Sequence, residues 1–179
     1  MALHTKGLSG IKKVAVVSVL LAVGLVLNIL EGLLPVFAVL PGAKLGLANV
    51  TTMVALVLFG PWTALLVGLL RTLLTGILTG AVTMFAYGGT GTLLSVAAMT
   101  LFSKIFGNKI SLIGQSMAGA FFFNVGQILV ASLVVHNWNM FRYLPVLTLV
   151  STVCALLTGF IALRAVQNSN LEGLLDGNR

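Results

Sequence analysis

Arg71 is the residue whose type and position most strongly suggest chemistry. It lies between Gly68 and Thr72, inside an apolar run long enough to cross a membrane. A charged side chain at that depth is costly, so it normally faces the interior of a helix bundle or a water-filled cavity. Two roles for Arg71 follow: an ion pair with Glu31 that joins two helices, or direct contact with a ligand.

The charges near Arg71 favour an anionic ligand. Glu31 and Lys44 lie beside apolar runs and are expected on the same, outer half of the protein. One carboxylate cannot neutralise both Lys44 and Arg71. A bound carboxylate or phosphate would neutralise the remaining positive charge. A guanidinium forms strong paired hydrogen bonds with such groups.

Polar side chains within the apolar runs extend this candidate site. Thr75 and Thr79 follow Arg71 at intervals of four, so the three residues share one helix face. Threonines in apolar helices also bond back to their own helix, which leaves a purely structural role open. Asn49 begins a polar group with Thr51 and Thr52 in the preceding run.

Asn124 and Gln127 form a second polar pair, three residues apart on one face of a later apolar run. Their amides are costly to expose to lipid, so both should point inward. They would contact either another helix or a ligand.

Other chemistry lacks the residues it needs. The glycine-rich stretch from Gly88 to Thr92 has neither the lysine nor the spacing of a phosphate-binding loop. His4 and His136 are isolated from other ligands, and the single cysteine, Cys154, excludes an internal disulfide. Asp176 is the only aspartate, so clustered aspartates cannot hold magnesium. We expect no catalytic residues, no metal site and no cofactor.

The composition indicates the elements that must position these residues. The chain has 179 residues, of which 59% are hydrophobic and 7% charged, and its mean hydropathy is +1.14. A soluble domain carries about 25% charged residues. A membrane helix needs about 20 apolar residues, so about six spans use nearly the whole chain. The sequence predicts an all-α membrane protein, a compact bundle of about six transmembrane helices.

Breaks in the apolar pattern separate the expected spans. A stretch rich in glycine and proline, from Glu31 to Lys44, follows the first span. The expected spans are 14–30, 45–59, 62–80, 81–102, 112–135 and 144–163. The predicted organisation is an amino-terminal segment 1–13, a transmembrane domain 14–165 and a polar tail 166–179.

The basic residues predict the orientation. With the amino terminus inside, the outer loops hold only Lys44 and Arg142. The cytoplasmic segments then hold Lys6, Lys12, Lys13, Lys104, Lys109, Arg164 and Arg179. An excess of lysine and arginine on the cytoplasmic side is typical of multi-pass proteins of the cell membrane. Both termini should therefore be cytoplasmic, and the net charge of +7 does not indicate nucleic-acid binding.

Small residues form stripes on several expected helices. Ala15, Ser18 and Ala22 share one face of the first span, and similar stripes run from Gly88 to Ser95 and from Gly114 to Gly119. Small residues let helices approach closely. Such a stripe serves either internal packing or docking of a partner membrane protein.

The run from Pro41 to Asn49, which contains Lys-Leu-Gly-Leu-Ala-Asn, resembles the signature of the Gx transporter family. Members of this family are often labelled heptaprenyl diphosphate synthase component I. The resemblance covers nearly the whole chain, and Phe123 departs from it where a histidine is expected. It continues through Glu31, Gly60, Arg71, Gly80, Tyr87, Gly88, Gly89, Ser95, Met99, Asn124 and Gln127.

This resemblance implies a function, because the family is similar to the substrate-binding S components of energy-coupling factor (ECF) transporters. Such components are six-helix bundles that capture a vitamin-like molecule near the outer surface. A coupling membrane protein and two ATPases then drive uptake. In S components a small-residue face on the first helix meets the coupling protein, and Ala15, Ser18 and Ala22 match that face.

The leading hypothesis is thus a substrate-binding subunit for uptake of a small anionic cofactor precursor. Glu31, Lys44, Asn49 and Arg71 would line an outward-facing pocket, and the stretch from Glu31 to Gly42 would cover it as a lid. Thr75, Asn124 and Gln127 complete the expected ligand-binding set. The alternatives are a non-catalytic membrane accessory subunit of a polyprenyl diphosphate synthase and a standalone secondary transporter.

Overall fold

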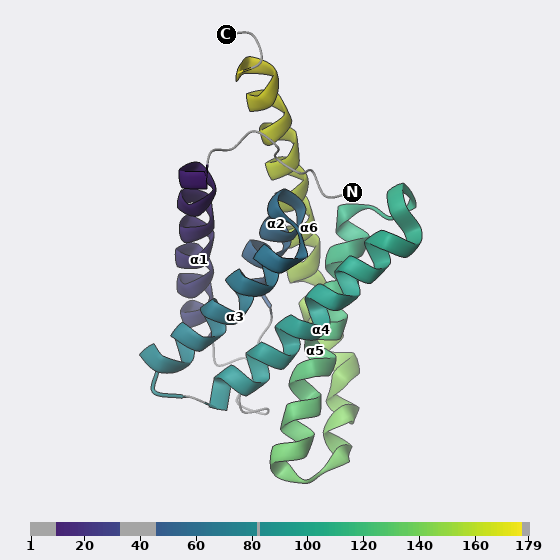
Figure 1. Ribbon diagram of the computed structural model, residues 1–179. Coiled ribbons are helices and arrows are strands. Elements are labelled where there is room, and N and C mark those ends of the chain that lie inside the picture. Colours follow the sequence, from purple (N-terminus) through teal and green to yellow (C-terminus); the bar gives the residue numbers. More distant parts are fainter. Residues whose placement is uncertain (1–9, 33–45, 82, 177–179) are drawn as a thin grey trace.

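The computed structural model describes residues 10–32, 46–81 and 83–176, and within them all regular secondary structure is helical (Figure 1). Its helices are α1 Gly10–Gly32, α2 Asn49–Phe59, α3 Pro61–Leu78, α4 Thr83–Phe106, α5 Leu112–Val135 and α6 Leu144–Asp176. Short 3-10 helices, η2 Gly107–Lys109 and η3 Trp138–Tyr143, lie in the last two connections. All of the α-helices except α2 are long and apolar enough to cross a membrane. The protein is therefore a multi-pass membrane protein, as the composition predicted.

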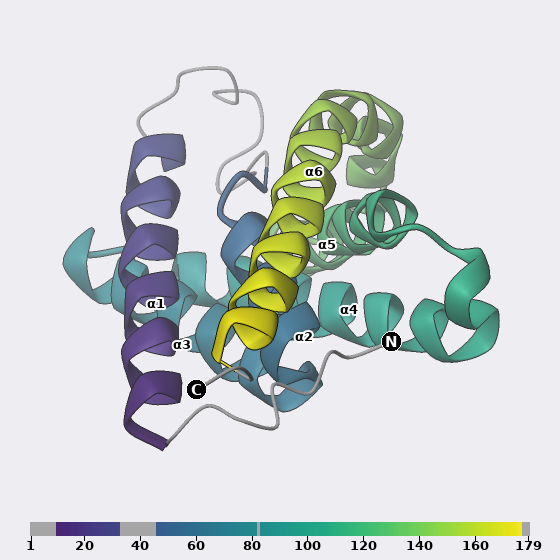
Figure 2. The ribbon, with the colours of Figure 1, turned by 90° about the horizontal axis from the view of Figure 1, so that it is seen from above.

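Helix α2 is the exception in length. It has 11 residues, which at about 1.5 Å per residue is roughly half of a 30 Å hydrocarbon core. The helix begins four residues after the expected start of the second span at Leu45. Eight of its residues are buried, and it packs against α1, α3 and α6 (Figure 2). Gly60, with φ of +88°, reverses the chain directly into Pro61, the first residue of α3.

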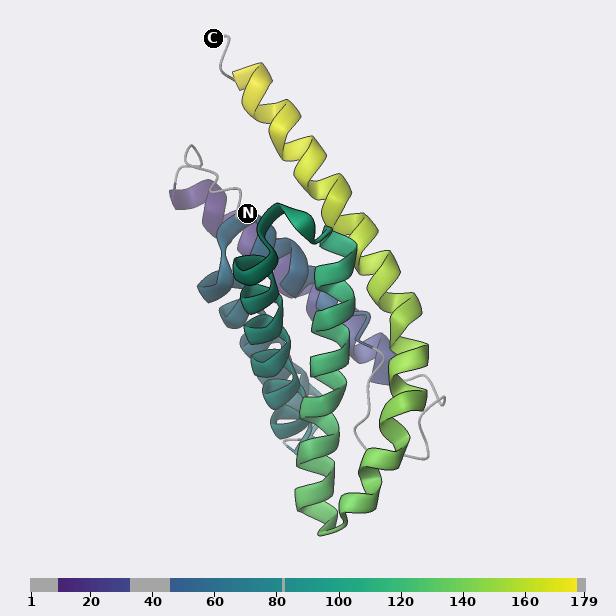
Figure 3. The same cartoon turned by 90° about the vertical axis from the view of Figure 1, so that its right-hand side faces the viewer.

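The most extensive contacts are those of α5 with α4 and with α6, and the three helices lie side by side in Figure 3. Glycine makes the close approach between α4 and α5 possible: a Cβ atom at Gly126 would lie 2.7 Å from the Cα atom of Gly91. Gly159 of α6 likewise lies against the backbone of Ile113 in α5. The small residues of α4 and α5 therefore serve internal packing, the first of the two roles considered for them.

Helix α1 lies at the side of the bundle. Only 17% of an 18-residue apolar stretch of α1 is buried, compared with 39% to 50% for the corresponding stretches of the other four long helices. It packs against α3 and α2 through a face that includes Gly24, Asn28 and Glu31. Most of its circumference is consequently available to lipid or to another protein.

The helix directions place charged residues at opposite ends of the bundle. The start of α1, the α2–α3 turn and the α4–α5 connection lie at one end, at the top in Figure 1. We call this the basic end, because the described basic residues near it are Lys12, Lys13, Lys104, Lys109 and Arg164. Glu31 and η3 lie toward the other end.

Three helices extend beyond their expected spans. Helix α1 begins at Gly10 and ends at Gly32, whereas 14–30 was expected. Helix α4 continues to Phe106, into the expected loop, and α6 continues to Asp176, through most of the expected polar tail. No glycine or proline interrupts the chain between Gly159 and Gly173, so the α6 helix persists after its apolar part ends.

Candidate functional site

Arg71 lies at the contact between α3 and the first turn of α2. Its side chain is only 1% exposed. Its Nη1 donates to the backbone carbonyl oxygen of Ala48 and, at 3.3 Å, to Oγ1 of Thr52. Nε is buried and has no hydrogen-bond partner among the described residues. The guanidinium thus holds α2 in place through Nη1, while the N–H group at Nε donates to none of the described residues.

Helix α1 closes the other side of Arg71. A Cβ atom at Gly24 would lie 3.0 Å from Cδ of Arg71 and 2.6 Å from Oγ1 of Thr51. Only a glycine therefore lets α1 pack this closely over the arginine. Close helix packing at a small residue therefore also occurs within the candidate site.

Asn28 of α1 connects to α3 through Thr75. Nδ2 of Asn28 donates to Oγ1 of Thr75 at 2.9 Å, and Thr75 in turn donates to the backbone oxygen of Arg71 at 2.9 Å. Asn28 and Thr75 are each 2% exposed. The hydroxyl of Thr75 therefore bonds back to its own helix, as threonines in apolar helices do, and also accepts from the neighbouring helix.

Glu31 and Asn49 lie at the end of α1 and the start of α2. The Glu31 side chain is 4% exposed and accepts a hydrogen bond from the backbone N–H of Gly46. Its charge also acts favourably on the guanidinium of Arg71. Asn49 is 7% exposed, and its Oδ1 is buried without a hydrogen-bond partner among the described residues.

The structure therefore gathers most of the expected ligand-binding residues on α1, α2 and α3. We call this group the Arg71 cluster: Asn28, Glu31, Asn49, Thr52, Arg71 and Thr75. Lys44 and residues 33–42 of the expected lid lie outside the described residues, whereas Glu31 and Gly32, its first two residues, belong to α1.

Asn124 and Gln127 lie on α5, and both are almost completely buried. Nδ2 of Asn124 donates to Oγ of Ser151 at 2.8 Å, which ties α5 to α6. This bond corresponds to the helix-to-helix role that the sequence left open for Asn124. Phe123, the departure from the family pattern, packs against Gly91 of α4.

Some members of the cluster were missing from the predicted site. Asn28 was not selected, although an amide in an apolar run, three residues before Glu31, is itself a signal for an inward-facing polar group. Thr52 was noted only as a neighbour of Asn49. Its role as an acceptor for Arg71 depends on how α2 packs on α3.

The small-residue stripe on α1 faces away from the rest of the chain. Ala15, Ser18 and Ala22 are all exposed. At about 100° per residue, they lie on the face opposite Gly24 and Asn28. Unlike the small residues of α4 and α5, they take no part in packing within the described part of the chain.

The described residues offer few groups for metal chemistry. No set of three or more His, Cys, Asp or Glu side chains lies together where it could hold a metal ion, within the part of the chain that the structure describes. The chemistry that the Arg71 cluster can perform is binding: it presents a buried cation, a carboxylate and amide groups.

Comparison with known proteins gives one match. No curated protein and no solved structure matches the chain. The family described as heptaprenyl diphosphate synthase component I matches residues 20–165, which is most of the chain and contains the whole Arg71 cluster. The chain therefore belongs to the heptaprenyl diphosphate synthase component I family.

Proposed function

We propose that this chain is the substrate-binding membrane subunit of an ECF-type system for uptake of a small anionic vitamin or cofactor precursor. The proposal rests mainly on Arg71, which is buried in a membrane-spanning helix while its Nε has no hydrogen-bond partner among the described residues. A buried charge of this kind is by default a functional group.

The hydrogen bonds of Arg71 support a ligand role in addition to a structural one. Both recorded bonds come from Nη1, so the fork formed by Nε and Nη2 is not used for holding α2. A carboxylate or phosphate that bonded to this fork would satisfy Nε and add negative charge beside the cation. Asn49, with an unsatisfied Oδ1, would offer a further polar contact to the same ligand.

The exposed stripe of small residues on α1 supports a function that requires partner proteins. Ala15, Ser18 and Ala22 form a surface on which another membrane helix could approach closely. We propose that a coupling membrane protein docks there and that two ATPases bound to it supply the energy.

The binding proposal is tested by the small molecules that copurify with the protein. The full chain and two variants, Arg71→Ala and Arg142→Ala, are purified in mild detergent and their bound molecules identified by mass spectrometry. Arg142 is exposed in η3, so it is a matched control for loss of an arginine. We expect an anionic molecule that is retained by the wild type and the control and lost from Arg71→Ala.

The same molecule in equal amounts in all three preparations would contradict the assignment of Arg71. Gel filtration of each variant shows whether a loss of ligand comes with a loss of folding. Arg71→Lys, which keeps the charge and removes the fork, then separates paired hydrogen bonding from simple charge attraction.

A second candidate function rests on the family description, which names a component of a synthase. In that case the chain is a non-catalytic membrane accessory subunit that anchors a soluble polyprenyl diphosphate synthase. This function predicts that a soluble, aspartate-rich synthase copurifies and that no small molecule depends on Arg71. The purification above distinguishes the two functions directly.

A further inference from the structure

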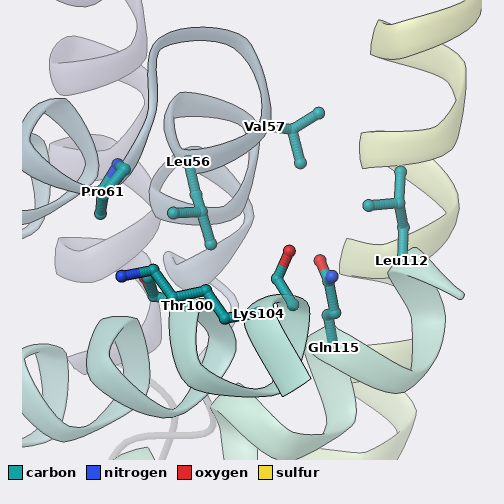
Figure 4. Close-up of a pocket in the computed structure, with 8 residues that line it drawn as sticks. Leu56, Val57, Pro61, Thr100, Lys104, Leu112 and Gln115 are labelled. Atoms are coloured by element: carbon teal, nitrogen blue, oxygen red, sulfur yellow. The ribbon is translucent and has the colours of Figure 1, made fainter. Parts of the chain in front are cut away.

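A pocket lies at the basic end of the bundle, away from the Arg71 cluster. It has a volume of about 290 Å³ and lies between the end of α2, the start of α3, the end of α4 and the start of α5 (Figure 4). Pro61 at its edge precedes Arg71 by ten residues, or about 15 Å along α3. The pocket is therefore a separate site, and it does not depend on the proposed function.

The lining of the pocket is apolar on one side and polar on the other. Leu56 and Val57 of α2, with Leu112 of α5, form the apolar wall. Thr100 and Lys104 of α4 and Gln115 of α5 form the polar wall. This combination suits a ligand that has a polar head joined to an apolar chain.

A polar group of the pocket lacks a partner within the described part of the chain. Oγ1 of Thr100 is buried there without a hydrogen bond, whereas Thr75 and Thr79 bond back to their own helix. Buried polar groups are rarely left unsatisfied, so this hydroxyl indicates a missing ligand. Gln115 is 5% exposed, and Figure 4 shows its amide directed into the pocket.

The charge around the pocket selects an anion. Lys104 lines the pocket. Lys13 lies nearby, because its Nζ is 5.7 Å from the ring centre of Phe59. Phe59 stands in the sequence between the lining residues Val57 and Pro61. The basic end has five cationic residues among the described side chains. Basic pockets between helix ends bind the head groups of anionic lipids.

The position of the pocket is at the level of lipid head groups. Trp62 next to Pro61 is 83% exposed, and Ile105 next to Lys104 is 64% exposed, so lipid surrounds this end of the helices. Tryptophan is enriched at the boundary between hydrocarbon and water. A soluble phosphate compound would not need the apolar wall or this location.

We propose that the pocket binds the phosphate of an anionic phospholipid. Lys104, Thr100 and Gln115 contact the phosphate oxygens, and Leu56, Val57 and Leu112 contact the beginning of the acyl chains. The volume is near the lower limit of about 300 Å³ for small-molecule sites, so it holds the head region and leaves the acyl chains in the bilayer.

The test uses native mass spectrometry of the full chain in detergent with short-chain phosphatidylglycerol, short-chain phosphatidylcholine or inorganic phosphate. We expect tight binding of phosphatidylglycerol only. Lys104→Gln should weaken it about fivefold, the effect of one basic residue near a membrane surface. Lys109→Gln is the matched control, because Lys109 is exposed at the same end without lining the pocket, and it should change affinity less than twofold.

Thr100→Val provides a second variant that does not threaten folding. Because the hydroxyl of Thr100 has no partner among the described residues, its removal should leave thermal stability unchanged while weakening phosphatidylglycerol binding. Equal effects of Lys104→Gln and Lys109→Gln would overturn the proposal, since they would show nonspecific attraction. Equal binding of phosphatidylcholine or of inorganic phosphate would overturn it as well, by removing the role of charge or of the apolar wall.

Discussion

Replacing Arg71 by methionine tests how far this residue supports the fold independently of any ligand. Methionine has a similar volume and no charge, so the change removes the hydrogen bonds of Nη1 to Ala48 and Thr52 without opening a large cavity. It also removes the cation whose charge acts on Glu31. The variant therefore isolates the polar contribution of Arg71 to the α2–α3 contact.

The expected magnitude follows from the contacts. A hydrogen bond from a charged donor contributes about 1.5–3 kcal/mol, which applies to the bond with Ala48. The bond with Thr52, at 3.3 Å, belongs at the weak end, about 0.5–1 kcal/mol. Because methionine also avoids burying a guanidinium whose Nε has no partner among the described residues, we expect a net loss of about 2 kcal/mol.

The free energy of unfolding is measured by titrating the detergent-solubilised protein with a denaturing detergent and following circular dichroism. Thr52→Val is the matched control, since it removes only the weaker bond and should cost about 1 kcal/mol. If Arg71→Met is as stable as the wild type, the inference that Nη1 holds α2 in place is refuted. A variant more stable than the wild type would refute it as well.

Three further variants test other contacts. Gly24→Ala should destabilise the protein by about 1–3 kcal/mol in the same titration, since its Cβ would overlap Thr51 and Arg71. Gly32→Ala is its control and should have little effect, because its Cβ would have no described atom within 4 Å. Ser151→Ala removes the acceptor of Asn124 inside the bundle and should cost about 1–3 kcal/mol; an unchanged midpoint would show that α5 and α6 do not depend on this bond. Ser18→Trp on the exposed face of α1 should leave stability within about 0.5 kcal/mol of the wild type but prevent copurification of the proposed coupling protein; continued copurification would exclude this face as the docking surface.

The sequence by itself determined the membrane class and most of the helices. Long apolar runs separated by glycine, proline and charged residues predicted α1, α3 and α5 to within a few residues, because the apolar length needed to cross a bilayer is a strong constraint. The same reasoning indicated that Arg71 must face inward. It also placed Glu31, Asn49 and Thr75 in one candidate site, because all of them are polar groups in or beside apolar runs.

Only the tertiary structure decided which contacts these residues make. Whether Arg71 bonds to Glu31 or to the backbone of Ala48 depends on where α2 begins, and this is set by packing with α1 and α3 and not by composition. The stripes of small residues look alike in the sequence, yet Gly91 and Gly126 are buried against each other while Ala15, Ser18 and Ala22 are exposed. Periodicity shows which residues share a helix face, and only the arrangement of the helices shows what that face contacts.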